Sequence, residues 1–95
     1  MIVSMIQIIL ELPDISSIKE KRKYVVSLKK RLEHKFRVSA AEVDLLDSLS
    51  FTQIGAAIVS NSKIFGESVL NKVLLFVENE FHLRIQDVQI YSEQF

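Results

Sequence analysis

The chain has 95 residues, 48% of them hydrophobic and 25% charged, and its formal net charge is zero. These values are typical of a soluble globular protein, and the length predicts a single domain over residues 1–95. Because the sequence contains no cysteine, disulfides, thiolate zinc sites and thiol nucleophiles are excluded, and we expect a cytoplasmic protein.

The first predicted element is a strand over residues 1–12, which is rich in β-branched and apolar side chains. Its apolar run is too short to span a bilayer, and no small-residue cleavage pattern follows it. We therefore predict neither a signal peptide nor a membrane partner. Both faces of the strand are apolar, with Ile6 and Ile8 on one and Met5 and Ile9 on the other. Such a strand is typical of the centre of a sheet.

A helix is predicted after Pro13, because Ser17 and Glu20 have the spacing of a capping box. In that motif the Ser17 hydroxyl accepts the backbone N–H of Glu20, and the Glu20 carboxylate reaches back to Ser17. Apolar residues then follow at helical spacing and predict one buried stripe. They are Ile18, Val25, Leu28, Leu32 and Phe36.

Two strands and a second helix come next. The alternation of residues 38–49 predicts a strand, and residues 51–60 predict another. Residues 61–62 can cap a helix over residues 63–82, from which Ile64 and Leu75 point away from the core. The buried stripe of this helix is Val69, Leu70, Val73, Phe76 and Val77.

A last strand over residues 83–91, irregular around residues 86–87, completes the order strand–helix–strand–strand–helix–strand. This order predicts an α+β, ferredoxin-like βαββαβ sandwich, in which two helices cover one face of a four-stranded antiparallel sheet. Right-handed crossovers place the strands of residues 1–12 and 51–60 at the centre of the sheet.

The charges are distributed unevenly along the chain. Residues 18–37 contain nine of the twelve Lys and Arg residues and only two Glu residues, so this segment carries +7. The other three basic and ten acidic residues give the remainder −7. A dense basic segment on a neutral protein indicates a polyanionic partner.

Five of these basic residues form the candidate binding surface, because they fall along the outer side and flank of the predicted helix. They are Lys19, Arg22, Lys23, Lys29 and Lys30. Such a ribbon could track a phosphate backbone, and RNA is favoured because duplex RNA is read largely by shape and phosphate contacts. The alternative is a solvated face with no partner. Lys21 lies nearer the apolar stripe, and we expect its stem to pack while its charge reaches solvent.

A second candidate surface is acidic. Strand alternation places Glu42 and Asp44 on one sheet face, about 7 Å apart, with Asp47 just beyond. Two carboxylates could ligate a hard cation or perform acid–base chemistry. No third ligand or nucleophile can be placed beside them, so we predict no metal site and no catalytic residue. We interpret the three as partner contacts.

The sheet face away from the helices is also predicted to be apolar, and large exposed apolar patches mark interfaces. We therefore expect a homodimer, with a monomer covered by its own strand tails as the alternative. The central strands offer no aromatic side chain for base stacking except Phe51 at one end, so RNA is not expected on the sheet.

The two histidines, His34 and His82, fall near the ends of the two helices. Without a nearby cysteine or carboxylate they make a poor metal site. We interpret them as residues that the helix dipole favours near a C-terminus. No cofactor and no small-molecule substrate are predicted.

Four segments carry a family resemblance: residues 16–22 (SSIKEKR), 38–44 (VSAAEVD, followed by Asp47), 54–61 (IGAAIVSN) and 69–73 (VLNKV). Together they resemble the YlxP-like family of small bacterial proteins, whose function is unknown. The resemblance implies the ferredoxin-like fold and a bacterial cytoplasmic protein linked to ribosome assembly or translation. It brings no catalytic residues.

The leading prediction is a non-enzymatic RNA- or ribosome-associated factor that binds phosphate backbone through its first helix. The alternative is a homodimeric protein-interaction or regulatory module that uses the acidic strand.

Overall fold

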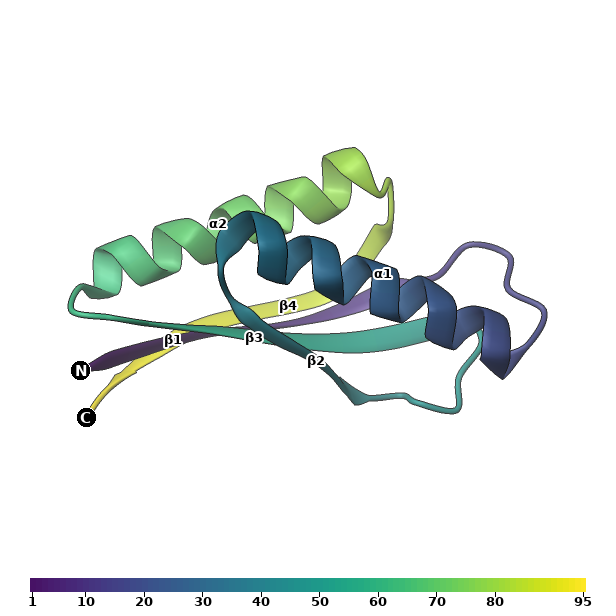
Figure 1. The fold of residues 1–95 in the computed structure, drawn as a ribbon, viewed down its shortest axis with the longest axis horizontal. Helices are drawn as coiled ribbons and strands as arrows, with labels where there is room; N and C mark the ends of the chain where they lie inside the picture. Colours follow the sequence, from purple (N-terminus) through teal and green to yellow (C-terminus); the bar gives the residue numbers. More distant parts are fainter.

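Two helices lie on one face of a four-stranded antiparallel sheet in the computed structural model, which describes residues 1–95 (Figure 1). The elements are β1 (Ile2–Glu11), α1 (Ile18–Phe36), β2 (Ser39–Asp44), β3 (Phe51–Ser60), α2 (Lys63–Glu80) and β4 (Arg84–Gln94). The strand order is β2-β3-β1-β4, so β1 and β3 are central. The ferredoxin-like α+β prediction is confirmed.

The hydrophobic core fills the space between the helices and the sheet face that they cover. The side chains of Ile6, Ile8 and Leu10 on β1 are buried there. Both helices close over them with residues of the predicted stripes: Val25, Leu28 and Leu32 of α1, and Leu70, Val73 and Val77 of α2. Burial of each such side chain stabilises the fold by about 1.5–3 kcal/mol, so this layer supplies most of the driving force.

Both helices begin at the predicted caps. The Ser17 hydroxyl accepts the Glu20 N–H at 3.1 Å, and the Ser62 hydroxyl accepts the Phe65 N–H at 3.2 Å. The Glu20 carboxylate differs from the prediction, because it accepts from the Ser16 hydroxyl at 2.8 Å and the Ser16 N–H at 3.3 Å. It therefore fixes the segment that precedes α1 and does not form the predicted hydrogen bond back to Ser17. Neither helix is long and apolar enough to cross a membrane.

Two strands differ in extent from their predictions. β2 ends at Asp44, because Leu45 adopts a left-handed backbone conformation with φ 61° that takes the chain out of the sheet. β4 extends to Gln94 along β1. Its predicted irregularity is confirmed, since Leu10 lies opposite Ile85 and Ile9 opposite Asp87, which leaves one extra residue in β4.

Helix α2 approaches β1 closely at Gly66. A Cβ atom there would lie 2.2 Å from the Ser4 Oγ and 2.8 Å from the Ser4 Cβ. Ser4 is fully buried, and its hydroxyl lies 2.8 Å from that of Ser92, which donates to the Glu67 carboxylate at 2.6 Å. Because residue 66 has no side chain, α2 can pack directly against the hydrogen-bonded cluster of Ser4, Ser92 and Glu67.

Replacement of Gly66 by alanine tests this approach. In an open helix the change stabilises by about 1 kcal/mol. Here the new methyl group collides with Ser4, and we expect a net destabilisation of about 1–3 kcal/mol, measured by urea denaturation.

The matched control is Ser68→Ala, an exposed position on the same helix, which should leave stability unchanged or slightly higher. In a Ser4→Gly background, which removes the colliding atoms, Gly66→Ala should cost clearly less. An equal cost in both backgrounds would refute the clash.

Candidate functional site

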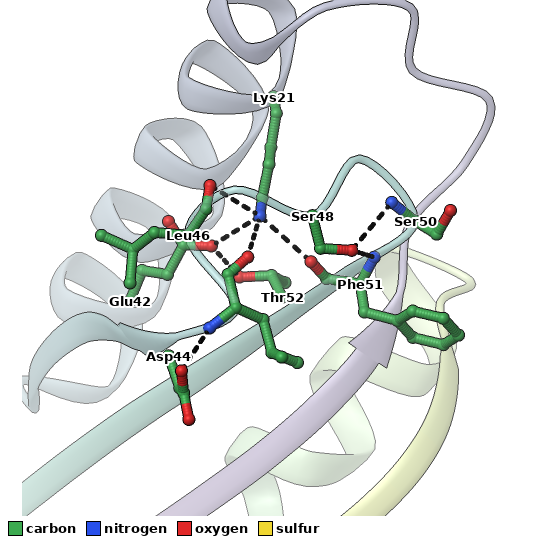
Figure 2. A network of polar contacts seen from close by, with 9 residues as sticks. Lys21, Glu42, Asp44, Leu46, Ser48, Ser50, Phe51 and Thr52 are labelled. Carbon is green, nitrogen blue, oxygen red and sulfur yellow. Dashed lines mark hydrogen bonds and ion pairs between the residues drawn. The ribbon is translucent and has the colours of Figure 1, made fainter.

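One basic residue of α1 points into the protein. Lys21 is 1% exposed, and its amino group forms the protein's one ion pair, with the Glu42 carboxylate at 3.1 Å. The same amino group donates to the carbonyl oxygens of Leu45, Leu46 and Phe51 (Figure 2). All its hydrogens therefore have acceptors, as a buried ammonium requires.

The prediction that Lys21 carries its charge to solvent is therefore wrong. Its acceptors come from the end of β2, the loop over residues 45–50 and the start of β3. The Thr52 hydroxyl completes the network by donating to the carboxylate of Glu42, the ion-pair partner of Lys21. Lys21 thus fixes α1, a loop and two strands to one another, and it determines which side of α1 faces outward.

The opposite side of α1 carries the predicted basic ribbon. The side chains of Lys19, Arg22, Lys23 and Lys30 are exposed and that of Lys29 is half-buried. The structure thus brings the five residues to one outer surface of a 19-residue helix. None of them pairs with a carboxylate, because the ion pair of Lys21 is the one present.

The acidic candidates are not brought together as predicted. A bulge in β2 places Glu42 opposite Ile54 and Asp44 opposite Gln53, with Val43 as the extra residue. The alternation therefore fails at this point, and the prediction that Glu42 and Asp44 share a face is wrong. Glu42 lies on the helix side, bound to Lys21, whereas Asp44 borders the open face.

Asp47 lies in the exposed loop after β2. Asp44 accepts the backbone N–H of the next residue, Leu45, at 2.8 Å and helps to hold the turn. Of the three acidic candidates, two thus stay accessible and one is used in the buried network. Their role as partner contacts stays a prediction.

The open face of the sheet carries a shallow groove of about 440 Å³. Its floor is made of small residues, Ala41, Gly55 and Ala57, and its edges include Met5 and Tyr91. Across its end, Gln53 donates a hydrogen bond of 2.8 Å to Gln7. Neither helix covers this face, and Val59 on it is 62% exposed.

A second groove, of about 600 Å³, lies between α1 and α2. It is lined by Lys30, Arg31, His34 and Lys35 of α1, with Phe76 and Glu80 of α2. Of these six residues, only Lys30 belongs to a binding surface predicted from the sequence. The basic side chains of residues 31 and 35 lie at the edge of the apolar stripe, and their position over α2 depends on how the two helices pack.

The two histidines lie in different hollows. His34 lines the groove between the helices, and His82 lines a hollow with Tyr24 and Phe81. No three His, Asp or Glu side chains gather as a metal site requires. Tyr24 packs edge-on against Phe81, with ring centres 6.2 Å apart, and burial raises the pKa of its hydroxyl above 10.0.

The fold and its outer helix define a small ferredoxin-like α+β protein with positive charge concentrated on one layer. Residues 3–90 match the family described as "Protein of unknown function (DUF503)". The chain is also 36% identical, over 66 residues, to a Bacillus subtilis (strain 168) protein described as "Uncharacterized protein YlxP". That match spans 70% of this chain and 72% of the relative. The chain therefore belongs to this YlxP-like family of unknown function, which confirms the resemblance.

Replacement of Lys21 by methionine tests the buried network. The variant leaves the Glu42 carboxylate and three carbonyl groups without their donor, and we expect a loss of about 3–5 kcal/mol in unfolding free energy. Chemical denaturation at neutral pH measures it.

The informative control adds Glu42→Gln. In the native background that change removes an ion-pair partner and should destabilise. In the Lys21→Met background it removes an unpaired charge and should restore part of the loss, since Thr52 can still donate to the amide oxygen. A loss of the same size in both backgrounds would contradict the coupling.

Proposed function

We propose that this protein is a non-enzymatic RNA- or ribosome-associated factor that binds phosphate backbone through the outer face of α1. The contacts are Lys19, Arg22, Lys23, Lys29 and Lys30. The observation that carries the proposal is that these five basic side chains line one outer surface while none has a carboxylate partner.

The physical basis is counterion release. A ribbon of unpaired Lys and Arg side chains attracts a polyanion, and each neutralised phosphate frees a condensed cation. Residues 19–30 extend over about 16 Å of helix, which is long enough for several phosphates. The remainder of the chain carries −7, so the protein's own field turns α1 toward an approaching polyanion.

The composition of the sheet independently favours RNA binding on the helix side of the protein. Ferredoxin-like proteins that bind single-stranded RNA on the sheet stack bases on aromatic side chains of the central strands. On the open face of β1 and β3 this protein has aliphatic and small residues and the amide pair Gln7–Gln53, and its one aromatic residue there, Phe51, lies at the end of β3. Contacts between side chains of the helices and the RNA phosphate backbone are therefore the binding mode that suits this protein.

The proposal predicts the salt dependence of a triple variant, Lys19→Gln, Arg22→Gln and Lys23→Gln. Binding of a fluorescent RNA oligonucleotide should weaken, and the slope of log binding constant against log salt concentration should fall by about 2–3, because three phosphate contacts are lost. Anisotropy titrations across a salt series measure both quantities.

The matched control changes the three basic residues outside the segment, Lys63, Lys72 and Arg84, to glutamine. It alters net charge by the same amount and should reduce the slope by less than 1. Equal effects of the two triple variants would show that net charge matters and the α1 surface does not. Co-sedimentation with ribosomal subunits across the same salt series tests the ribosomal partner.

A second candidate function is a homodimeric interaction module, with Glu42, Asp44 and Asp47 as the predicted partner contacts. The observation that favours it is the uncovered apolar face, where the small-residue groove would receive side chains of a second copy. The bulge leaves Asp44 at the edge of that groove and Asp47 accessible, whereas Glu42 would contribute only by shaping β2.

Ala57→Asp in the groove floor tests the homodimer. A charge there would have to be buried at the interface, so the dimer should dissociate while the fold persists. Sedimentation velocity measures the oligomer, with Ser68→Asp on exposed α2 surface as control. A native protein that is monomeric at tens of micromolar would rule out the homodimer.

A further inference from the structure

Arg31 is held between the two helices by aromatic rings. Its guanidinium carbon lies 4.8 Å from the centre of the Phe81 ring and 5.4 Å from that of Phe76. These rings are fixed in turn, because they meet edge-on with centres 5.8 Å apart. The guanidinium is thus placed by cation–π contacts, while its N–H groups donate to no acceptor in the protein.

A second cation is placed in the same way. The Lys35 amino group lies 4.9 Å from the centre of the Phe76 ring and forms no ion pair. With Lys30 and His34 these side chains line the groove of about 600 Å³, where Glu80 is the one acidic residue. Charged donors therefore converge on a solvent-open hollow whose one acidic side chain, Glu80, forms an ion pair with none of them.

We propose that this groove is a phosphate site and that it receives a phosphate group of the RNA backbone. The inference rests on the proposed function and deepens it, since Lys30 belongs both to the α1 ribbon and to the groove. A guanidinium presents a planar fork that matches two phosphate oxygens. Because contacts with two aromatic rings already favour this position of Arg31, the side-chain entropy lost when the phosphate binds is reduced.

The C-terminal ends of both helices oppose an anion here, since Lys35 lies in the last turn of α1 and Glu80 is the last residue of α2. A helix C-terminus is equivalent to about half a negative charge, and its effect falls off within the last turn. Three full positive charges, on residues 30, 31 and 35, outweigh these two half charges together with Glu80. The groove is therefore attractive to a phosphate.

The experiment compares Arg31→Gln, Arg31→Lys and Phe81→Leu in RNA titrations across a salt series, with Lys63→Gln as the matched surface control. Arg31→Gln should weaken binding about tenfold or more and lower the salt slope by about 0.7–0.9, because a charged fork is lost. Lys63→Gln should change affinity less than twofold.

The other two variants separate placement from charge. Phe81→Leu keeps every charge and should weaken binding about two- to fivefold with an unchanged salt slope, because Arg31 loses a ring that positions it. Since Phe81 also packs against Tyr24, Arg31→Lys serves as a second variant that keeps the charge and removes the fork. Arg31→Lys should also weaken RNA binding, and thermal unfolding verifies that both variants fold.

The outcomes distinguish this inference from the proposed function. If native protein binds no RNA at low salt, the proposed function fails and the groove fails with it. A different outcome refutes the groove alone. In that case RNA binds, the α1 triple variant weakens binding, and Arg31→Gln changes RNA affinity no more than Lys63→Gln does. A third arm follows the Arg31 side-chain NMR signal during titration with the oligonucleotide and with pyrophosphate.

A shift with the oligonucleotide at concentrations where pyrophosphate gives none assigns the phosphate to a polymer. If pyrophosphate binds as tightly as the oligonucleotide or more tightly, the groove still binds phosphate, but the proposal that this phosphate belongs to an RNA backbone is overturned. No shift with either ligand overturns the site.

Discussion

The buried ion pair between Lys21 and Glu42 is the constraint on which the arrangement of this protein depends. A lysine amino group can enter the interior only where its hydrogens are accepted, and four oxygens from β2, its following loop and β3 accept them here. Because Lys21 is fixed inward, α1 cannot rotate about its axis. The basic residues one or two positions away, such as Lys19, Arg22 and Lys23, must then lie on the outside.

This orientation gives the molecule two unlike surfaces. The helix layer carries unpaired positive charge on α1 and in the groove around Arg31, whereas the opposite side of the sheet is apolar and shallowly grooved. The phosphate-binding proposal and the homodimer proposal use opposite layers, so a partner on one surface leaves the other free. A twofold dimer through the sheet would present two α1 helices in one assembly, and RNA held by both would bind with increased avidity.

The sequence predicts the fold well because local signals agree with one another. The caps at Ser17 and Ser62, the periodicity of both helices and the irregularity near Gln86 all appear in the structure. The site is predicted less completely, for physical reasons. Strand alternation cannot reveal the bulge at Val43 that separates Glu42 from Asp44. Nor does helix periodicity reveal contacts between elements, and the burial of Lys21 and the seating of Arg31 on Phe81 both depend on such contacts.

Binding of phosphate backbone on the helix layer is tested most directly by amide chemical shifts. Isotope-labelled protein is titrated with an RNA oligonucleotide, and the shift changes are mapped onto the structure. We expect changes along α1 and at the α1–α2 groove, with the open face of β1 and β3 unaffected. Changes concentrated on the sheet face around Gly55 and Ala57, with α1 unchanged, would contradict binding on the helix layer.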